Sequence, residues 1–419
     1  MSRFLRFRRL GFTFSAQIYN QIVVLGVQVL QVPFLLSAWG PDRYGGWLVL
    51  YAVPSYLTLS DFGFTTVAKN GMVMRAASGE RDAVLQIYHS VFVMLLVAAA
   101  IIGVASGLGV GMATLTSVFN LGPLSEESAK LTILLLIASV LLNQFFLLLA
   151  AGVRASGRPA AEVAWGATGR LLEGIATVVV ALFTERVELA ALAIVVVRAL
   201  CTVSVWGWLK HIAPDIPLGF AQARFDVIRR MTNPSISYML LSLAQTLTIQ
   251  GPIVLLGALG TPQQTVLYST SRTLARLGTA AANLVNFSLI PEYSHLHGAG
   301  NVAGFRHMER LHLLIAVVGI TLYGLTLWLL GPWIMQVWTH GHVAVVYPFF
   351  GLLVAGVAAE MLWTALFAPI GATNQHARLS YLFVVLACVS AVLAYFGALS
   401  AGATGIAAVI LGLHVIMCL

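Results

Sequence analysis

Long apolar runs, separated by short polar turns, recur along the whole chain. A helix that crosses a bilayer needs about 20 mostly apolar residues, and twelve stretches of the sequence meet this requirement. They are Phe14–Trp39, Gly45–Ala68, Tyr88–Gly111, Leu131–Gly152, Ala160–Thr184, Val187–Trp208, Pro234–Leu259, Gln264–Leu289, Leu311–Trp338, Val345–Pro369, Leu379–Leu399 and Ala401–Leu419. The pattern predicts an all-α, polytopic membrane protein with about twelve transmembrane helices.

The composition supports a membrane protein. Hydrophobic residues make up 59% of the chain and charged residues 9%, whereas soluble domains carry roughly 25% charged residues. Most of the surface therefore faces lipid, and the net charge of +8 does not indicate a nucleic-acid partner. The cysteines, Cys201, Cys388 and Cys418, all lie in apolar runs, so they offer neither a disulfide framework nor a metal-ligand spacing.

The basic residues indicate the orientation of the chain. With the N-terminus in the cytoplasm, sixteen of the 23 lysines and arginines fall on the cytoplasmic side and four fall within helices. Only Arg43, Lys130 and Arg186 lie in outer loops. This asymmetry follows the positive-inside rule and predicts that both termini are cytoplasmic. The first apolar run is longer than the core of a signal peptide, so we expect it to be an uncleaved helix.

The chain is expected to consist of two pseudo-repeated six-helix lobes, residues 1–212 and 233–419, joined by a cytoplasmic linker at 213–232. Gly40 ends the first apolar run, and Gly260 ends the seventh, 220 positions later. Pro33 and Pro252 precede these glycines, and a proline inside a helix kinks it. Repeated halves are typical of secondary transporters.

One stretch resembles a known family. Residues 35–64 read LLSAWGPDRYGGWLVLYAVPSYLTLSDFGF, which resembles the start of polysaccharide transporters, the Wzx-type O-antigen flippases. The residues that carry this resemblance are Gly40, Tyr44, Gly45, Trp47, Asp61 and Gly63. The segments GVRASGR from Gly152 and GATNQ from Gly371 resemble short inner turns of the same family.

The resemblance implies a function as well as a fold. The family shares a superfamily with multidrug exporters and lipid II flippases, and its two lobes surround a central cavity and rock between inward-open and outward-open states. The implied cargo is a polyprenyl-pyrophosphate-linked oligosaccharide in the bacterial inner membrane. Membrane lipids and the polysaccharide polymerase machinery are the other implied partners, and no cofactor is implied. The chain reaches Leu419 in the twelfth helix, which favours the twelve-helix branch of the superfamily.

Two buried arginines are candidates for binding the cargo. An ionisable group inside a bilayer costs about 2.5–3.5 kcal/mol on insertion scales and usually faces the bundle interior. Arg272 and Arg276 are four residues apart and project from one helical face. Because guanidinium groups suit phosphate oxygens, we expect this pair to bind the pyrophosphate. The alternative is that they pair with Glu360 or with backbone carbonyls and stabilise the C-terminal lobe.

A second group of charges lies on the fifth and sixth predicted helices. Arg170 and Glu173 are three residues apart and can pair on one face. We expect a structural ion pair that Arg198 extends. The alternative is that Glu173 binds a proton or cation and couples transport to an ion gradient. Asp61 is expected to brace or gate the inner end of the second helix, against Lys69 or Arg75.

Polar stripes on the first and seventh helices suggest a lining for sugars. The first stripe consists of Gln17, Gln21, Gln28 and Gln31, and the second of Ser242, Gln245 and Thr248. Such groups either join helices or line water. We take Gln21, Gln28, Gln245 and Tyr56 as candidate substrate contacts, with Tyr51 and Tyr56 as aromatic faces on the opposite wall; packing is the alternative for all of them.

Two other functions remain open. A cation-coupled multidrug exporter is the first, although cationic drugs favour acidic groups and the first helix has none. A membrane-embedded glycan polymerase, ligase or acyltransferase is the second, although the outer loops are short. The pairs His295 and His297, and His340 and His342, fall short of the three or four ligands of a zinc site. We therefore expect no metal and no enzyme activity.

Overall fold

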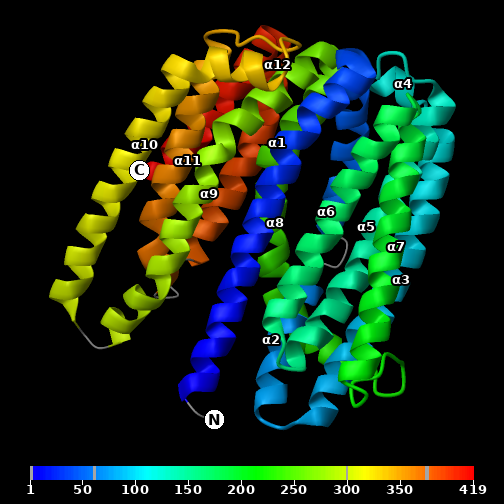
Figure 1. Ribbon diagram of the computed structural model, residues 1–419, viewed down its shortest axis with the longest axis vertical. Coiled ribbons are helices and arrows are strands. Elements are labelled where there is room, and N and C mark those ends of the chain that lie inside the picture. Colours follow the sequence, from blue (N-terminus) through cyan, green and yellow to red (C-terminus); the bar gives the residue numbers. More distant parts are fainter. Residues whose placement is uncertain (1–2, 60–62, 299–300, 373–376) are drawn as a thin grey trace. The chain divides into compact units, whose positions relative to one another are not determined.

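The computed structural model is helical throughout its described elements (Figure 1). It describes residues 3–59, 63–298, 301–372 and 377–419. The α-helices are α1 (Arg3–Ser55), α2 (Phe64–Ala77), α3 (Arg81–Met112), α4 (Leu115–Val118), α5 (Glu126–Ala155), α6 (Pro159–Phe183), α7 (Val187–Ile212), α8 (Phe225–Leu259), α9 (Pro262–Gly298), α10 (Val302–Trp338), α11 (Phe349–Ala372) and α12 (Ala377–Cys418). A 3-10 helix, η1, covers Tyr56–Leu59.

The helices agree with the predicted spans. Nine segments of the described chain are long and apolar enough to cross a bilayer. Two of these helices contain a break in helical geometry. The break in α1, at Gly40 (φ 69°, ψ 169°), separates the first predicted span from the start of the second, and the break in α12, at Ala401–Gly402, separates the last two. The eighth predicted span lies on α9. The fold is therefore that of an all-α, multi-pass membrane protein.

The second predicted span, Gly45–Ala68, is not one continuous helix. α1 ends at Ser55, η1 covers Tyr56–Leu59, and α2 begins at Phe64, after residues 60–62, which lie outside the described chain. Gly63, immediately before α2, has φ 77°, which is a left-handed conformation that glycine adopts without steric cost. A Cβ on Gly63 would also collide with the backbone carbonyl of Ser235. Both facts explain why apolar periodicity alone missed this interruption.

The chain forms two compact units. The first comprises Met1–Gly40, Leu50–Val118 and Pro123–Leu243, and the second comprises Pro41–Val49, Phe119–Gly122 and Ala244–Leu419. The units therefore divide inside α8, and two short segments of the N-terminal half belong to the second unit. The lobes proposed from the sequence, 1–212 and 233–419, remain a prediction about the repeat.

The core of the first unit lies among α2, α3, α5 and α7. Tyr88 of α3 and Phe146 of α5 are among its largest fully buried side chains. Gly152 on α5 allows the side chain of Leu209 on α7 to approach, since a Cβ there would lie 2.9 Å from the Cδ2 atom of Leu209. Small residues at such positions let transmembrane helices pack closely.

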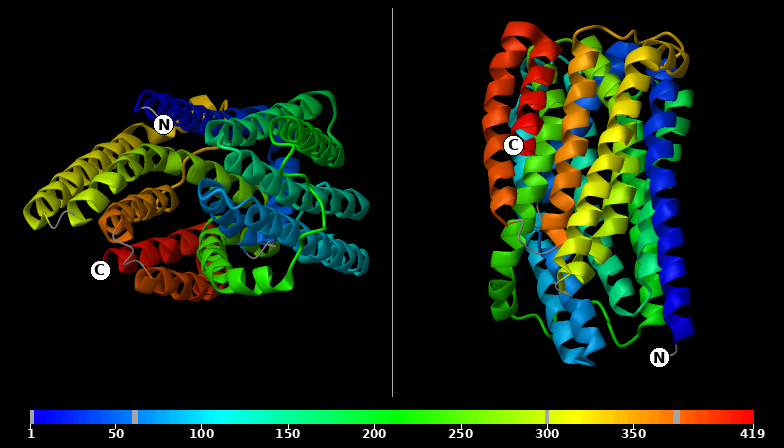
Figure 2. Two further views of the ribbon diagram at one scale, coloured as in Figure 1. Left: turned by 90° about the horizontal axis from the view of Figure 1, so that it is seen from below. Right: turned by 90° about the vertical axis from the view of Figure 1, so that its left-hand side faces the viewer.

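In the second unit, α9 contacts α10 and α11, and α11 contacts α10 and α12. Figure 2 shows α9 and α10 as a long hairpin. The outer face of α10 is apolar and open: Leu322, Leu329 and Trp333 are between 61% and 73% exposed. Exposed apolar faces of this extent are expected where lipid is the solvent.

The two segments of α12 pack against each other at two glycines. A Cβ on Gly405 would collide with the backbone carbonyl of Gly397. We expect Gly405→Ala to lower the free energy of unfolding by about 1–3 kcal/mol, because backbone has to move. Gly412→Ala is the matched control, since nothing lies within 4 Å of its Cβ. Thermal unfolding in detergent checks this, and equal midpoints for the two variants would contradict it.

Three turns meet in the second unit, at the repeat identified in the sequence. The side-chain amide of Gln263 donates to the carboxylate of Asp42, and the Cα of Gly45 lies against the backbone of Pro262. The backbone N–H of Asn120 donates to the carbonyl of Gly257 at 2.6 Å. The segments that follow Gly40 and Gly260, separated by 220 positions, are thus neighbours.

Candidate functional site

An ion pair between α6 and α7 lies inside the first unit. The Nη2 atom of Arg198 lies 2.7 Å from the Oε2 atom of Glu173, and their side chains are only 8% and 16% exposed. The guanidinium also lies 5.2 Å from the centre of the Phe146 ring. Gly169, one turn before Glu173 on α6, is buried against the guanidinium of Arg198. A Cβ on Gly169 would lie 3.5 Å from the Nη1 atom of Arg198. The pair is enclosed by protein on several sides.

The pairing of Arg170 with Glu173, expected from their spacing, is not the arrangement found. Glu173 pairs with Arg198, and the Nη2 atom of Arg170 instead donates to the side-chain oxygen of Asn20 at 2.7 Å. A spacing of three residues permits contact but does not select it when a cation on another helix lies closer to the carboxylate. Arg170 thereby links α6 to α1, where Val27 also packs on Gly174.

A second charged cluster lies in the second unit. Arg276 on α9 binds Glu360 on α11 through two hydrogen bonds, one of them 2.8 Å long between Nη2 and Oε1. This fork-to-carboxylate geometry is the strongest form of the pair. The Nε2 atom of His414 lies 3.8 Å from the Oε2 atom of Glu360, and the indole N–H of Trp363 donates to Nδ1 of His414 at 3.1 Å.

The hydrogen bonds of His414 determine its tautomer. Because the Trp363 indole is only a donor, the Nδ1 atom of His414 accepts and the proton of the neutral ring lies on Nε2, the atom that faces Glu360. Sequence reasoning named Glu360 but missed His414 and Trp363. A signal existed: His414 is a titratable residue within the last apolar run, and Trp363 lies three residues after Glu360.

Arg272 is held differently from Arg276. Its Nη1 atom donates to the backbone carbonyl of Ile249 on α8, and its guanidinium lies 5.8 Å from the centre of the Tyr268 ring. These contacts match the alternative named from the sequence, in which the two arginines stabilise the C-terminal lobe: Arg272 binds a backbone carbonyl and Arg276 binds Glu360. A role for either arginine in binding an anion stays a prediction.

The glutamines of the polar stripe on α1 lie next to residues that contact α6. Asn20 and Val27 of α1 contact α6, and Gln21 and Gln28 each follow by one residue, about 100° further around the helix. Gln28 is exposed and Gln21 half-buried. In α8, Gln245 is exposed, and its backbone carbonyl accepts from the hydroxyl of Thr248 at 2.9 Å. Their role as sugar contacts stays a prediction, as does that of the half-buried Tyr56 in η1.

Asp61 lies outside the described residues, so the brace or gate assigned to it stays a prediction. The basic groups expected to meet it have other partners. Lys69 lies 3.8 Å from Glu162, and Arg75 lies 2.5 Å from Glu80. Within the described part of the chain, no cluster of three or more histidine, cysteine, aspartate or glutamate residues could hold a metal ion.

Known proteins resemble this chain in structure but not in sequence. No family model and no curated protein sequence matches the chain. Among solved structures, an inward-facing multidrug resistance MATE family transporter of the MOP superfamily matches with a TM-score of 0.74 over 97% of this chain and 95% of its own, at 13% identity. The chain has the fold of MATE transporters.

Two further structures support this assignment of the fold. A MATE structure in the bent conformation matches with a TM-score of 0.65 at 11% identity, over 98% of this chain and 92% of its own. A mutant of the Vibrio cholerae MATE transporter VcmN gives 0.59 at 14% identity, over 98% and 93%. The resemblance of residues 35–64 to polysaccharide transporters implies a transporter fold of this kind, and membership of the superfamily stays a prediction. At such identities the similarity is one of fold.

Proposed function

We propose that the protein is a secondary transporter that exports amphipathic organic compounds across the bacterial inner membrane by alternating access, with both termini in the cytoplasm. The observation that carries this proposal is the match of nearly the whole chain to the fold of a multidrug resistance transporter. A half-buried carboxylate in each unit, Glu173 and Glu360, supports coupling to an ion gradient, because ionisable groups inside membrane helices usually serve transport.

A second candidate is the transfer of a polyprenyl-pyrophosphate-linked oligosaccharide to the outer leaflet, with the polysaccharide polymerase machinery as a further partner. The specific observation in its favour is the balance of charge in the helices. Glu173 and Glu360 already have arginine partners, whereas Arg272 contacts a backbone carbonyl and an aromatic ring. Surplus cations inside the helices suit a pyrophosphate better than a cationic drug.

Two strains distinguish these candidates. In a strain stripped of its own drug exporters, we expect the protein to accelerate efflux of a cationic dye such as ethidium and to raise resistance to it. Collapse of the membrane ion gradients should stop this efflux. In a strain lacking the protein, surface polysaccharide and lipid-linked repeat units should be unchanged. Accumulation of the lipid-linked unit, loss of surface polymer and unaltered dye efflux would instead favour the oligosaccharide flippase.

A further inference from the structure

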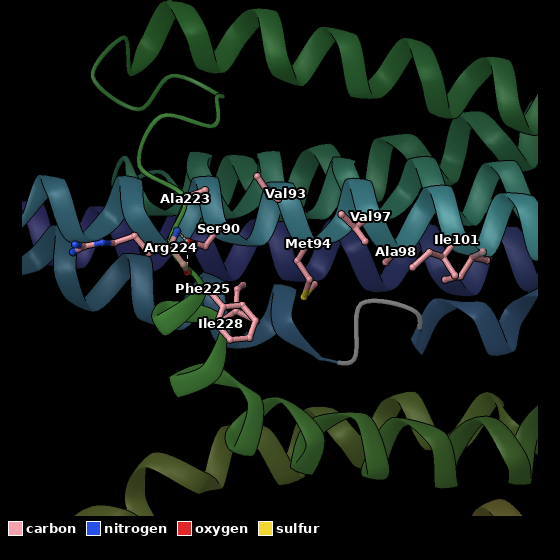
Figure 3. Close-up of a pocket in the computed structure, with 11 residues that line it drawn as sticks. Ser90, Val93, Met94, Val97, Ala98, Ile101, Ala223, Arg224, Phe225 and Ile228 are labelled. Carbon is pink, nitrogen blue, oxygen red and sulfur yellow. Dashed lines mark hydrogen bonds between the residues drawn. The ribbon is translucent and has the colours of Figure 1, made fainter.

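An apolar groove of about 590 Å³ runs along α3 in the first unit. One wall is formed by α3, and the other by Ala223 and Arg224, which directly precede α8, and by the first turn of α8 (Figure 3). The lining on α3 is Val93, Met94, Val97, Ala98, Ile101 and Ile102, with Ser90 at one end. Arg224, Phe225 and Ile228 line the opposite side.

The groove is held in shape by hydrogen bonds between the linker and α3. The backbone N–H of Arg224 donates to the hydroxyl of Ser90 at 2.8 Å, and that hydroxyl donates to the carbonyl of Arg224 at 3.2 Å. One residue earlier on α3, His89 accepts from the backbone N–H of Gln222 at Nδ1, at 3.2 Å. Its Nε2 atom bonds the carbonyl of Pro217 at 2.9 Å. The segment before α8 is thus fixed to α3 at one end of the groove.

The length of the groove matches one leaflet of a bilayer. Ser90 and Ile101 are eleven residues apart on α3, which corresponds to about 17 Å of helix. Half of the hydrocarbon core of a bilayer is about 15 Å thick. The groove begins where the linker leaves α3 and extends toward the middle of the membrane-spanning helix. An acyl chain of the adjacent leaflet would therefore fit along its whole length.

The charge at the end of the groove suits a lipid head group. The guanidinium of Arg224 lies at the end opposite Ile101 and points away from the apolar walls (Figure 3). Among the residues that the structure describes, no carboxylate pairs with it. The nearest acid in sequence, Asp226, pairs with Arg230 at 2.9 Å. An exposed cation next to an apolar channel offers charge complementarity to a phosphate that carries an acyl chain.

We propose that this groove binds an anionic phospholipid of the membrane. One acyl chain lies along α3 between Ser90 and Ile101, and the phosphate pairs with Arg224. The lipid thereby joins α3 to the first turn of α8, a helix that carries residues of both compact units. This site is separate from the buried ion pairs and does not depend on the identity of the transported compound.

Native mass spectrometry of the full-length protein tests the proposal, with dioleoyl phosphatidylglycerol as the anionic probe and dioleoyl phosphatidylcholine as the neutral one. We expect wild-type protein to retain the anionic lipid preferentially. Arg224→Gln should weaken that retention about tenfold, the usual effect of removing one charged hydrogen-bonding group. Val97→Trp should abolish it, because the indole fills the apolar channel.

Matched controls separate this site from general lipid binding. Arg229→Gln removes an exposed arginine of α8 that does not line the groove, and Leu108→Trp adds an indole to an exposed position of α3 beyond the groove. Both should retain the lipid like the wild type, with unchanged thermal midpoints. Retention unaffected by Arg224→Gln or by Val97→Trp would overturn the proposal. Preferential binding of a polyprenyl phosphate over the phospholipid would overturn it as well.

Discussion

Replacing Arg198 by methionine is expected to lower the free energy of unfolding by about 3–5 kcal/mol, because the carboxylate of Glu173 remains buried without its cation. The pair is among the most enclosed in the described chain, with side chains 8% and 16% exposed. Denaturant or thermal unfolding in detergent measures the loss. Arg75→Met is the control: its pair with Glu80 has side chains 53% and 45% exposed, and surface pairs contribute about 0–1 kcal/mol.

A double variant distinguishes a structural pair from a coupling site. Arg198→Met combined with Glu173→Leu removes both charges and should recover most of the lost stability, since buried pairs are often replaceable by apolar residues. If Glu173 couples transport to an ion gradient, the recovered protein should still lack gradient-driven efflux. Gradient-driven efflux at the wild-type rate in the double variant, or in Glu173→Gln alone, would leave the pair with only a structural role.

Replacing Arg272 and Arg276 together by glutamine is expected to produce a loss of similar size in the second unit. Glu360 loses its bidentate partner. Because the side chains of Arg276 and Glu360 are 29% and 18% exposed, the loss should approach but not exceed the value of about 3–5 kcal/mol for a fully buried pair. The lysine pair should lose less, because the charge remains although the planar fork is absent. Glu309→Gln, on the exposed face of α10, should change stability by less than about 0.5 kcal/mol.

Adding Glu360→Gln to the glutamine pair removes the carboxylate that would otherwise stay unpaired, so the triple variant tests anion binding separately from stability. The triple variant should fold like the wild type in the same unfolding assay. If the two arginines bind a pyrophosphate, the folded triple variant should fail to clear the lipid-linked repeat unit, while the lysine pair keeps partial activity. Normal clearance by the triple variant would end the anion-binding hypothesis for Arg272 and Arg276.

The helices were predictable from the sequence because each is set by a local property, the length of an apolar run. Each of the twelve predicted spans overlaps a helix, although the second is divided among α1, η1 and α2 and the tenth begins four residues before α11. The sequence predicts the end of a span at Gly40, and the structure has non-helical angles there, but the chain re-enters a helix at the next residue without a loop. The interruption at Gly63 depends on the distant Ser235 backbone, which no local pattern reveals.

Partners in the candidate sites were harder to predict than the residues themselves. Each of Arg170, Glu173, Arg198, Arg276 and Glu360 stands out as a charge in an apolar run. Which partner each residue contacts depends on which helices are adjacent. Glu173 pairs with Arg198, Arg170 bonds Asn20, and His414 lies beside Glu360. Periodicity assigns a residue to a face but does not say which helix that face meets.

The assignment of Pro41–Val49 and Phe119–Gly122 to the second unit has a consequence for biosynthesis. The ribosome produces both segments long before α8 and α9, which supply the Gly257 carbonyl and the Pro262 backbone that they contact. Domains otherwise tend to fold as units, N-terminal first. Here two early segments must wait for late helices, so assembly of the second unit cannot begin and end within the C-terminal half of the chain.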